Sequence, residues 1–254
     1  MHFTDTQIIA WLAGFMWPFL RISVFIATMP IFGSKVVPVK IRIAMAVILT
    51  LSVTSLIPPV PKIDLFSATS LLISVNQVLI GVTMAFIFHL VFSLFVMGGQ
   101  IIAMQMGLGF ASMIDPQNGV QVPVISQFFV LMVTLLFFTL DGHLAMITLI
   151  LDSFQTLPIN AEFVLQENWW NIVLWANEMF ANAVRLALPA VVIILLVNMA
   201  FGIVTRAAPQ FNIFAVGFPF MLLVGFVAIY FSLGNISPIF IEAIESATQI
   251  VKFM

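Results

Sequence analysis

The chain has 254 residues, of which 63% are hydrophobic and only 7% are charged, and its mean hydropathy is +1.22. This composition excludes a soluble globular domain and indicates an integral membrane protein. The net charge of −2 provides no basic stripe and argues against nucleic acid as a partner, while the absence of cysteine excludes disulfides and thiol nucleophiles.

Apolar runs of roughly membrane-spanning length follow one another along the chain. They cover residues 8–32, 43–57, 71–97, 124–140, 173–204 and 214–233. Because the runs are continuously apolar and do not alternate with polar residues, they predict helices and argue against a transmembrane barrel. We therefore expect an all-α, polytopic membrane protein in which residues 1–254 form a single helical domain.

The lengths and charges of these runs constrain their placement. Run 43–57 is short for a membrane span, and run 173–204 is longer than a hydrocarbon core of about 30 Å requires, so some helices are not expected to cross lipid. Lys35, Lys40 and Arg42 follow the first run, and Arg206 follows the fifth. Since Lys and Arg favour the cytoplasmic side, we expect the first, third and fifth connectors inside and both termini outside.

Three charged residues lie within apolar runs: Arg21, Glu178 and Arg185. Facing hydrocarbon, each would cost on the order of 3 kcal/mol, so each is expected to be buried against other protein. Glu178 and Arg185 are seven residues apart, which places them on one face of a helix. We interpret all three as buried polar residues of a helical bundle, and a functional role in the membrane is the alternative.

A glycine-containing segment separates the third run from the fourth. Glycines permit unusual backbone angles, and Asp115-Pro116 favours an extended or turn geometry. An apolar loop at membrane depth is tolerated only where it is buried in protein or lines a cavity. We therefore expect a structured loop that plugs a pore, with the gate formed by Gly107, Gly109, Phe110, Met113, Ile114, Asp115, Pro116 and Gly119.

Asp141 and His143 follow the fourth run. We interpret Asp141 as the N-cap of a short helix at residues 144–151, with His143 in its first turn, and a buried proton relay is the alternative. His89 stands alone in its run and is expected to be a hydrogen-bonded bundle residue. Beyond residue 233, apolar and charged positions recur at helical spacing and predict an amphipathic C-terminal helix.

Signatures of catalysis are missing from the sequence. It contains no H-E-x-x-H motif, no G-x-S-x-G motif and no glycine-rich phosphate-binding loop. We therefore expect no enzyme activity, no catalytic, metal-binding or cofactor-binding residues, and no cofactor.

The dense polar connector after the fifth run completes a set of motifs that together resemble one family. They are Met29-Pro30-Ile31-Phe32-Gly33, Gln105-Met106-Gly107-Leu108 with Asp115-Pro116, Asp141-Gly142-His143, and the stretch from Arg206 to Phe214 with Gly217-Phe218-Pro219. Along its whole length the chain resembles the FliR family of flagellar type III export-gate membrane proteins, which has counterparts in virulence type III secretion.

This resemblance implies a subunit of the export gate in the bacterial inner membrane, at the flagellar basal body. It implies FliP and FliQ as partners in a pore for unfolded polypeptide, with FlhA-type and FlhB-type proteins and membrane lipid as further partners. Residues 1–172 would be FliP-like, with a plug loop at 106–123, and residues 173–254 would be a FliQ-like hairpin with the amphipathic helix. Phe110, Met113 and Ile114 would seal the plug.

The same resemblance gives the connector after the fifth run a role. Arg206, Pro209, Gln210 and Asn212 would lie at the hairpin tip, near the cytoplasmic entrance, as assembly contacts. Two other classes of function stay open: a secondary transporter that uses buried ionisable residues, and a stand-alone channel that needs no partner subunits. The transporter class is weakened because the two halves of the sequence show no internal repeat.

Overall fold

The computed structural model describes residues 5–58, 60–61, 63, 67–115, 119–160, 169–208 and 213–252. In these ranges all the apolar runs are helical, and the predicted short helix and C-terminal helix are also present, so the all-α prediction is confirmed. The elements are α1 (Asp5–Thr28), α2 (Val39–Val53), α3 (Ala68–Gln105), β1 (Ser112–Ile114), β2 (Gln121–Pro123), α4 (Val124–Thr139), α5 (Gly142–Thr156), α6 (Trp169–Ala207), α7 (Ile213–Leu233) and α8 (Ile236–Lys252).

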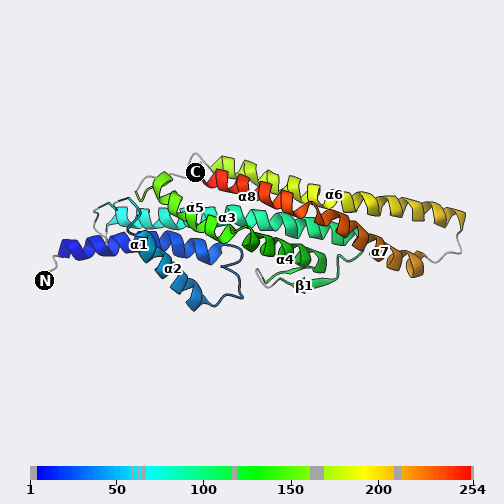
Figure 1. Ribbon diagram of the computed structural model, residues 1–254, viewed down its shortest axis with the longest axis horizontal. Helices are drawn as coiled ribbons and strands as arrows, with labels where there is room; N and C mark the ends of the chain where they lie inside the picture. Colours follow the sequence, from blue (N-terminus) through cyan, green and yellow to red (C-terminus); the bar gives the residue numbers. More distant parts are fainter. Residues whose placement is uncertain are drawn as a thin grey trace.

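Helix α3 is the spine of an elongated bundle. It is 38 residues long, and α1, α4, α6 and α8 all pack against it. The start of α1 and the end of α8 lie toward one end of the bundle, whereas the end of α6 and the start of α7 lie at the other (Figure 1). The α1–α2 connector and the β-hairpin lie part-way along the bundle. The placement of the first, third and fifth connectors on the cytoplasmic side stays a prediction.

Four helices are long and apolar enough to cross a membrane in the described part of the chain. They are Trp11–Thr28 within α1, α3, Trp170–Ala207 within α6, and Val216–Leu233 within α7. Helices α4 and α5 are long and apolar enough only when taken together, and they meet at a bend of 70°. Helix α2 has only 15 residues and is too short for a span, as its run length predicted.

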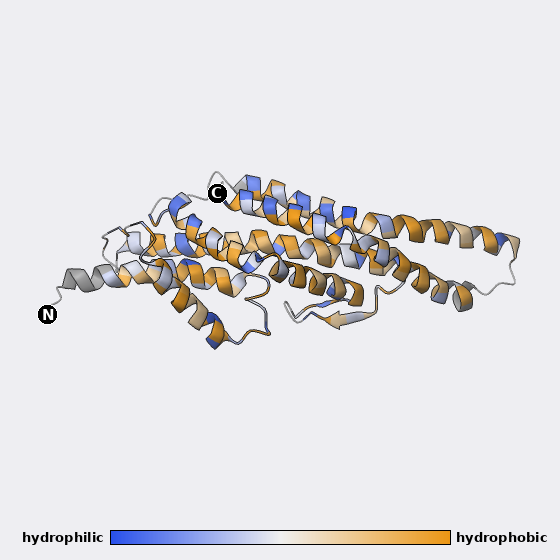
Figure 2. Cartoon of the chain, viewed as in Figure 1, coloured by the Kyte–Doolittle hydropathy of each residue, from blue (hydrophilic) through white to orange (hydrophobic). Residues whose placement is uncertain are grey.

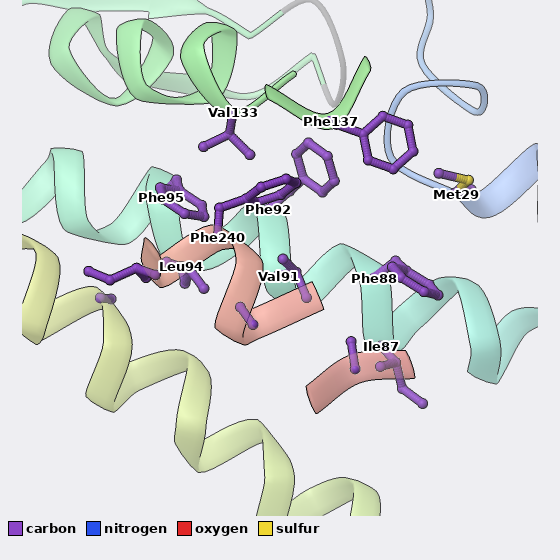
Figure 3. Close-up of a cluster of buried hydrophobic side chains, with 14 of the residues drawn as sticks. Met29, Ile87, Phe88, Val91, Phe92, Leu94, Phe95, Val133, Phe137 and Phe240 are labelled. Atoms are coloured by element: carbon purple, nitrogen blue, oxygen red, sulfur yellow. The ribbon is translucent and has the colours of Figure 1, made fainter. Parts of the chain in front are cut away.

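Aromatic side chains from three helices build the core. Phe92 and Phe95 of α3 meet Phe240 of α8 edge to face, with ring centroids 6.3 and 6.0 Å apart, and Phe92 meets Phe137 of α4 at 6.1 Å. Figure 3 shows these rings converging between the helices. Such pairs add about 0.5–1.5 kcal/mol each beyond the burial of their area. The amphipathic helix α8 therefore packs its apolar face on the bundle itself.

Two glycines bring α1 and α4 close to the spine. A Cβ atom at Gly81 of α3 would lie 2.7 Å from the carbonyl oxygen of Arg21 in α1, and one at Gly99 would lie 2.5 Å from the Cα of Ser126 in α4. Both neighbours are backbone atoms, which cannot move aside cheaply. The two helix contacts therefore depend on glycine at these positions.

Arg21 is fully buried and saturated with hydrogen bonds. Its Nε donates to Oε1 of Gln77 in α3 at 2.8 Å. Nη1 donates to the carbonyl oxygen of Ser153 at 2.8 Å and to its Oγ at 3.1 Å, and Nη2 donates to the carbonyl oxygen of Leu157 at 2.8 Å. The guanidinium also lies 4.2 Å from the ring centroid of Phe154. The prediction that Arg21 is buried against protein is confirmed.

This cation is neutralised by helix-terminal carbonyls. Ser153 and Leu157 lie at the end of α5, where carbonyl groups carry partial negative charge. None of the hydrogen bonds that the guanidinium makes within the described ranges goes to a carboxylate. Arg21 therefore joins α1, α3 and the end of α5.

Replacing Arg21 with Met is expected to lower the free energy of unfolding by about 3 kcal/mol or more. The substitution roughly keeps the volume but leaves Oε1 of Gln77 and the carbonyl of Leu157 buried without the donors that Arg21 supplies, at about 1–3 kcal/mol each. Thermal unfolding in detergent measures the change.

The matched control is Arg185→Met. Arg185 pairs with Glu242 on the surface, where the two side chains are 60% and 59% exposed, so its loss should change stability by no more than about 1 kcal/mol. Equal stability of the two variants would contradict the role given to Arg21.

Candidate functional site

The β-hairpin after α3 begins with a glycine turn. The N–H of Leu108 donates to the carbonyl of Ala103 at 2.8 Å, and the N–H of Gly107 donates to that of Met104 at 3.1 Å. This pair of hydrogen bonds is the pattern that ends a helix at a residue with left-handed backbone angles. Gly107 supplies that residue, with φ of +76°, so the prediction of an unusual backbone is confirmed there. Gly109 lies outside the left-handed region.

The two strands of the hairpin are held by backbone pairing. Met113 lies opposite Val122 in the antiparallel ladder. The N–H of Asp115 donates to the carbonyl of Val120 at 2.8 Å, and the N–H of Gly119 donates to that of Asp115 at 2.7 Å. Gly119 has φ of +70°, which again favours glycine. The loop is therefore structured as predicted; Pro116 lies outside the described residues.

The apolar side chains predicted to seal the loop point away from the core of the chain. Phe110 is fully exposed, Ile114 is 66% exposed and Met113 is 43% exposed. The described part of the chain therefore leaves these three apolar side chains exposed. Any seal that they make requires surfaces outside this chain.

A groove of about 490 Å³ separates the hairpin from the helices. Its polar lining comes from Asp115 of the hairpin turn and from His89, Ser93 and Gln100 of α3, and Met179 of α6 closes one side. Asp115 is buried. The three α3 residues follow one another at intervals of four and seven, so they form a polar stripe on one helix face. The helical spacing of His89, Ser93 and Gln100 is visible in the sequence and would have predicted this stripe.

The α1–α2 connector reaches the hairpin turn through Lys35. A Cβ atom at Gly119 would lie 3.0 Å from Cε and 3.3 Å from Cδ of Lys35, with Nζ closer still. Arg42 holds the connector by donating to the carbonyls of Val37 at 3.1 Å and Gly33 at 3.3 Å. The sequence had suggested only a topological role for these cations. The fold gives Lys35 a contact with the candidate gate.

Two of the charges predicted to be buried lie on the surface. Glu178 is exposed, and Nη1 of Arg185 donates to Oε2 of Glu242 at 2.8 Å in an exposed ion pair. The expectation of burial was wrong because the first half of α6 runs beside α8 along a polar face of the bundle (Figure 2). Arg185 is therefore paired across α6 and α8, and Glu178 and Arg185 do not pair with each other.

Asp141 occupies the N-cap position of α5 and His143 lies in its first turn, as predicted, but neither residue is fully buried. Asp141 is exposed and precedes α5 with φ of 53°, and its side chain makes no capping hydrogen bond. Its carbonyl instead accepts from the N–H groups of Leu144 and Ala145. His143 is half-buried; its Nδ1 is buried without a hydrogen-bond partner among the described residues, and its ring lies 5.7 Å from that of Phe138. No hydrogen bond joins Asp141 to His143 in the described part of the chain.

The predicted assembly contacts are only partly described. Arg206 is exposed in the last turn of α6, where a cation is stabilised by the helix terminus. Pro209, Gln210 and Asn212 lie outside the described residues. Across the described ranges, no group of three His, Asp or Glu side chains is arranged to hold a metal ion.

Comparison with known proteins is consistent with this geometry. The model of the family described as "Bacterial export proteins, family 1" matches residues 12–247. The chain is 36% identical over 238 residues to the flagellar biosynthetic protein FliR of Pectobacterium carotovorum subsp. carotovorum, covering 94% of this chain and 91% of that protein. It is 35% identical to FliR of Escherichia coli (strain K12), covering 89% of this chain and 86% of that protein. It is 32% identical to FliR of Bacillus subtilis (strain 168), covering 84% of this chain and 83% of that protein.

Replacing Gly107 with Ala is expected to destabilise the hairpin by about 1 kcal/mol, because a Cβ atom strains the left-handed backbone. Amide hydrogen exchange of residues 108–115 should accelerate about fivefold. Gly109→Ala is the matched control, since its Cβ meets only ordinary contacts from 3.4 Å outward. Unchanged exchange in the Gly107 variant would contradict the assignment of the turn.

Proposed function

Because this chain belongs to the FliR family of bacterial export proteins, and is thus a membrane-embedded component of flagellar biosynthesis and export, we propose that it forms a protein-conducting pore with FliP and FliQ. The pore lies in the bacterial inner membrane, and its substrates are unfolded polypeptides. The relatives are export proteins and not enzymes, which supports a role in transport without catalysis.

The observation that carries this proposal is the uncovered apolar surface of α6. Only 17% of its span is buried inside the chain, compared with 61% for α3. Exposed apolar side chains continue from Trp170 and Leu174 near its start to Met199 and Ile203 near its end. With 39 residues, α6 is about 58 Å long, roughly twice the hydrocarbon core of about 30 Å. Lipid therefore covers only part of it, and partner subunits cover the rest.

Helix α7 and the hairpin extend the same argument. The span of α7 is 28% buried, so the α6–α7 pair offers a long apolar face to neighbours. This supports the division into a FliP-like part at residues 1–172 and a FliQ-like helical hairpin at residues 173–254. Phe110, Met113 and Ile114 reach the surface on a hairpin held by two left-handed glycines. In the assembled pore these side chains form the plug.

The tip between α6 and α7 is the remaining element of the proposal. Arg206, Pro209, Gln210 and Asn212 form assembly contacts near the cytoplasmic entrance, where FlhA-type and FlhB-type proteins dock. This role is supported by the exposure of Arg206 at the end of the longest helix among the described residues. It is also supported by the scarcity of charge in the chain as a whole.

A secondary transporter gains little support from the arrangement. Such a protein gathers buried ionisable groups near a substrate site. Glu178 and Arg185 are on the surface, and Arg21 is saturated by Gln77 and the end of α5. A stand-alone channel leaves the uncovered surface of α6 unexplained.

Co-expression with the FliP and FliQ proteins of the same organism should yield one stable complex that contains all three chains. The exposed apolar surface of α6 and α7 requires such cover. Native mass spectrometry in detergent measures the composition. Recovery of the chain only as a monomer or homo-oligomer, with both partners expressed, would overturn the proposal.

Deleting residues 111–119 should make the assembled complex leak ions, because the plug is removed while the helices remain. Ion flux into liposomes containing the purified complex measures the leak. Phe110→Ser, Met113→Ser and Ile114→Ser combined provide a milder test, since they retain the backbone pairing of the hairpin. A tight complex in both cases contradicts the plug.

A further inference from the structure

One face of α7 packs closely against the junction between α3 and the hairpin. Met106 is buried, and its side chain wraps around Gly225 of α7: a Cβ atom added at Gly225 would lie 2.6 Å from Cγ and 2.7 Å from Sδ of Met106. On the next residue, a Cβ atom at Gly107 would lie 3.4 Å from Cε2 of Phe218. Phe218 and Gly225 are seven residues apart, so they share one face of the helix.

This contact of α7 with Met106 and Gly107 is separate from the main packing of α7. In the described part of the chain, α7 packs mainly against α6. The contacts of Gly225 and Phe218 with Met106 and Gly107 therefore connect the α6–α7 pair directly to the start of the hairpin. A displacement of α7 acts on residues that lie at the turn.

The direction of the hairpin depends on the position of the Met106 backbone. Met106 is the C-cap of α3 and precedes the left-handed Gly107, so a shift of its backbone changes the direction in which the hairpin starts. Its Cγ atom lies near the backbone. An added methyl group at Gly225 therefore cannot be relieved by rotating only the end of the methionine side chain.

We infer that Met106 and Gly225 are positioning residues that couple the α6–α7 pair to the hairpin. The α7 helix holds the α3–hairpin junction in place, and a movement of α7 is transmitted through Met106 to the hairpin. This inference rests on the proposed function, because it assigns the coupling to the plug of that pore.

The first test is Gly225→Val in the complex with FliP and FliQ. The added side chain overlaps Met106, displaces the junction and should raise the ion leak of liposomes about tenfold. Gly14→Val in α1 is the matched control, since nothing lies within 4 Å of a Cβ atom there and the change in helix propensity is the same. Adding Met106→Ala to Gly225→Val makes room for the new side chain and should restore a tight complex.

The second test locks the contact and does not depend on tolerance of a larger side chain. The chain has no native cysteine, so Met106→Cys combined with Gly225→Cys gives a single engineered pair. Oxidation of the assembled complex should reduce protein export at least about tenfold, because the junction can no longer move, and a reductant should restore it. The unmodified complex, in which this chain has no cysteine, is the control and is expected to export equally under oxidising and reducing conditions.

The outcomes separate this inference from the proposed function. A leak after deletion of residues 111–119, together with a tight Gly225→Val complex and normal export by the cross-linked pair, overturns the coupling and leaves the plug in place. A tight complex after the deletion removes the plug and the coupling with it. If the Gly225→Val complex fails to assemble, export by the cross-linked pair decides alone.

Discussion

The buried guanidinium of Arg21 is the constraint on which the arrangement of the N-terminal helices depends. A cation in an apolar bundle must find acceptors, and in this chain the acceptors are Gln77 of α3 and the final carbonyls of α5. The end of α5 is thereby fixed against α1. Since α4 and α5 meet at a bend of 70°, fixing α5 also sets the direction from which α4 approaches the spine.

The opposite end of α4 carries the hairpin, so the same spine orients the candidate gate. Helix α3 ends at a glycine turn, β2 runs directly into α4, and Gly99 lets α4 lie close to α3 between the two. The hairpin is consequently held at its base by rigid helices, while its tip contacts the α1–α2 connector through Lys35. Such a base gives a surface loop a defined position without burying its apolar side chains.

The surface of the chain divides into regions with different requirements. The first half of α6 and the outer face of α8 carry an ion pair and other polar groups that water can solvate, whereas the second half of α6 and α7 are almost entirely apolar (Figure 2). Apolar side chains nevertheless continue along α6 beyond the thickness that lipid covers. These exposed apolar side chains agree with a membrane-embedded member of a family of bacterial export proteins.

The sequence by itself determined the membrane class and the presence and order of the helices, because these follow from composition and local periodicity. It also marked the glycines at which the backbone is free to turn, and the structure uses this freedom at Gly107 and Gly119. Its motifs also identified the family. Only the tertiary structure decided that Arg185 pairs with Glu242, 57 residues away, at the surface, and that Met106 meets Gly225. Burial and pairing depend on which distant segments pack side by side, and one helix seen alone carries no record of its neighbours.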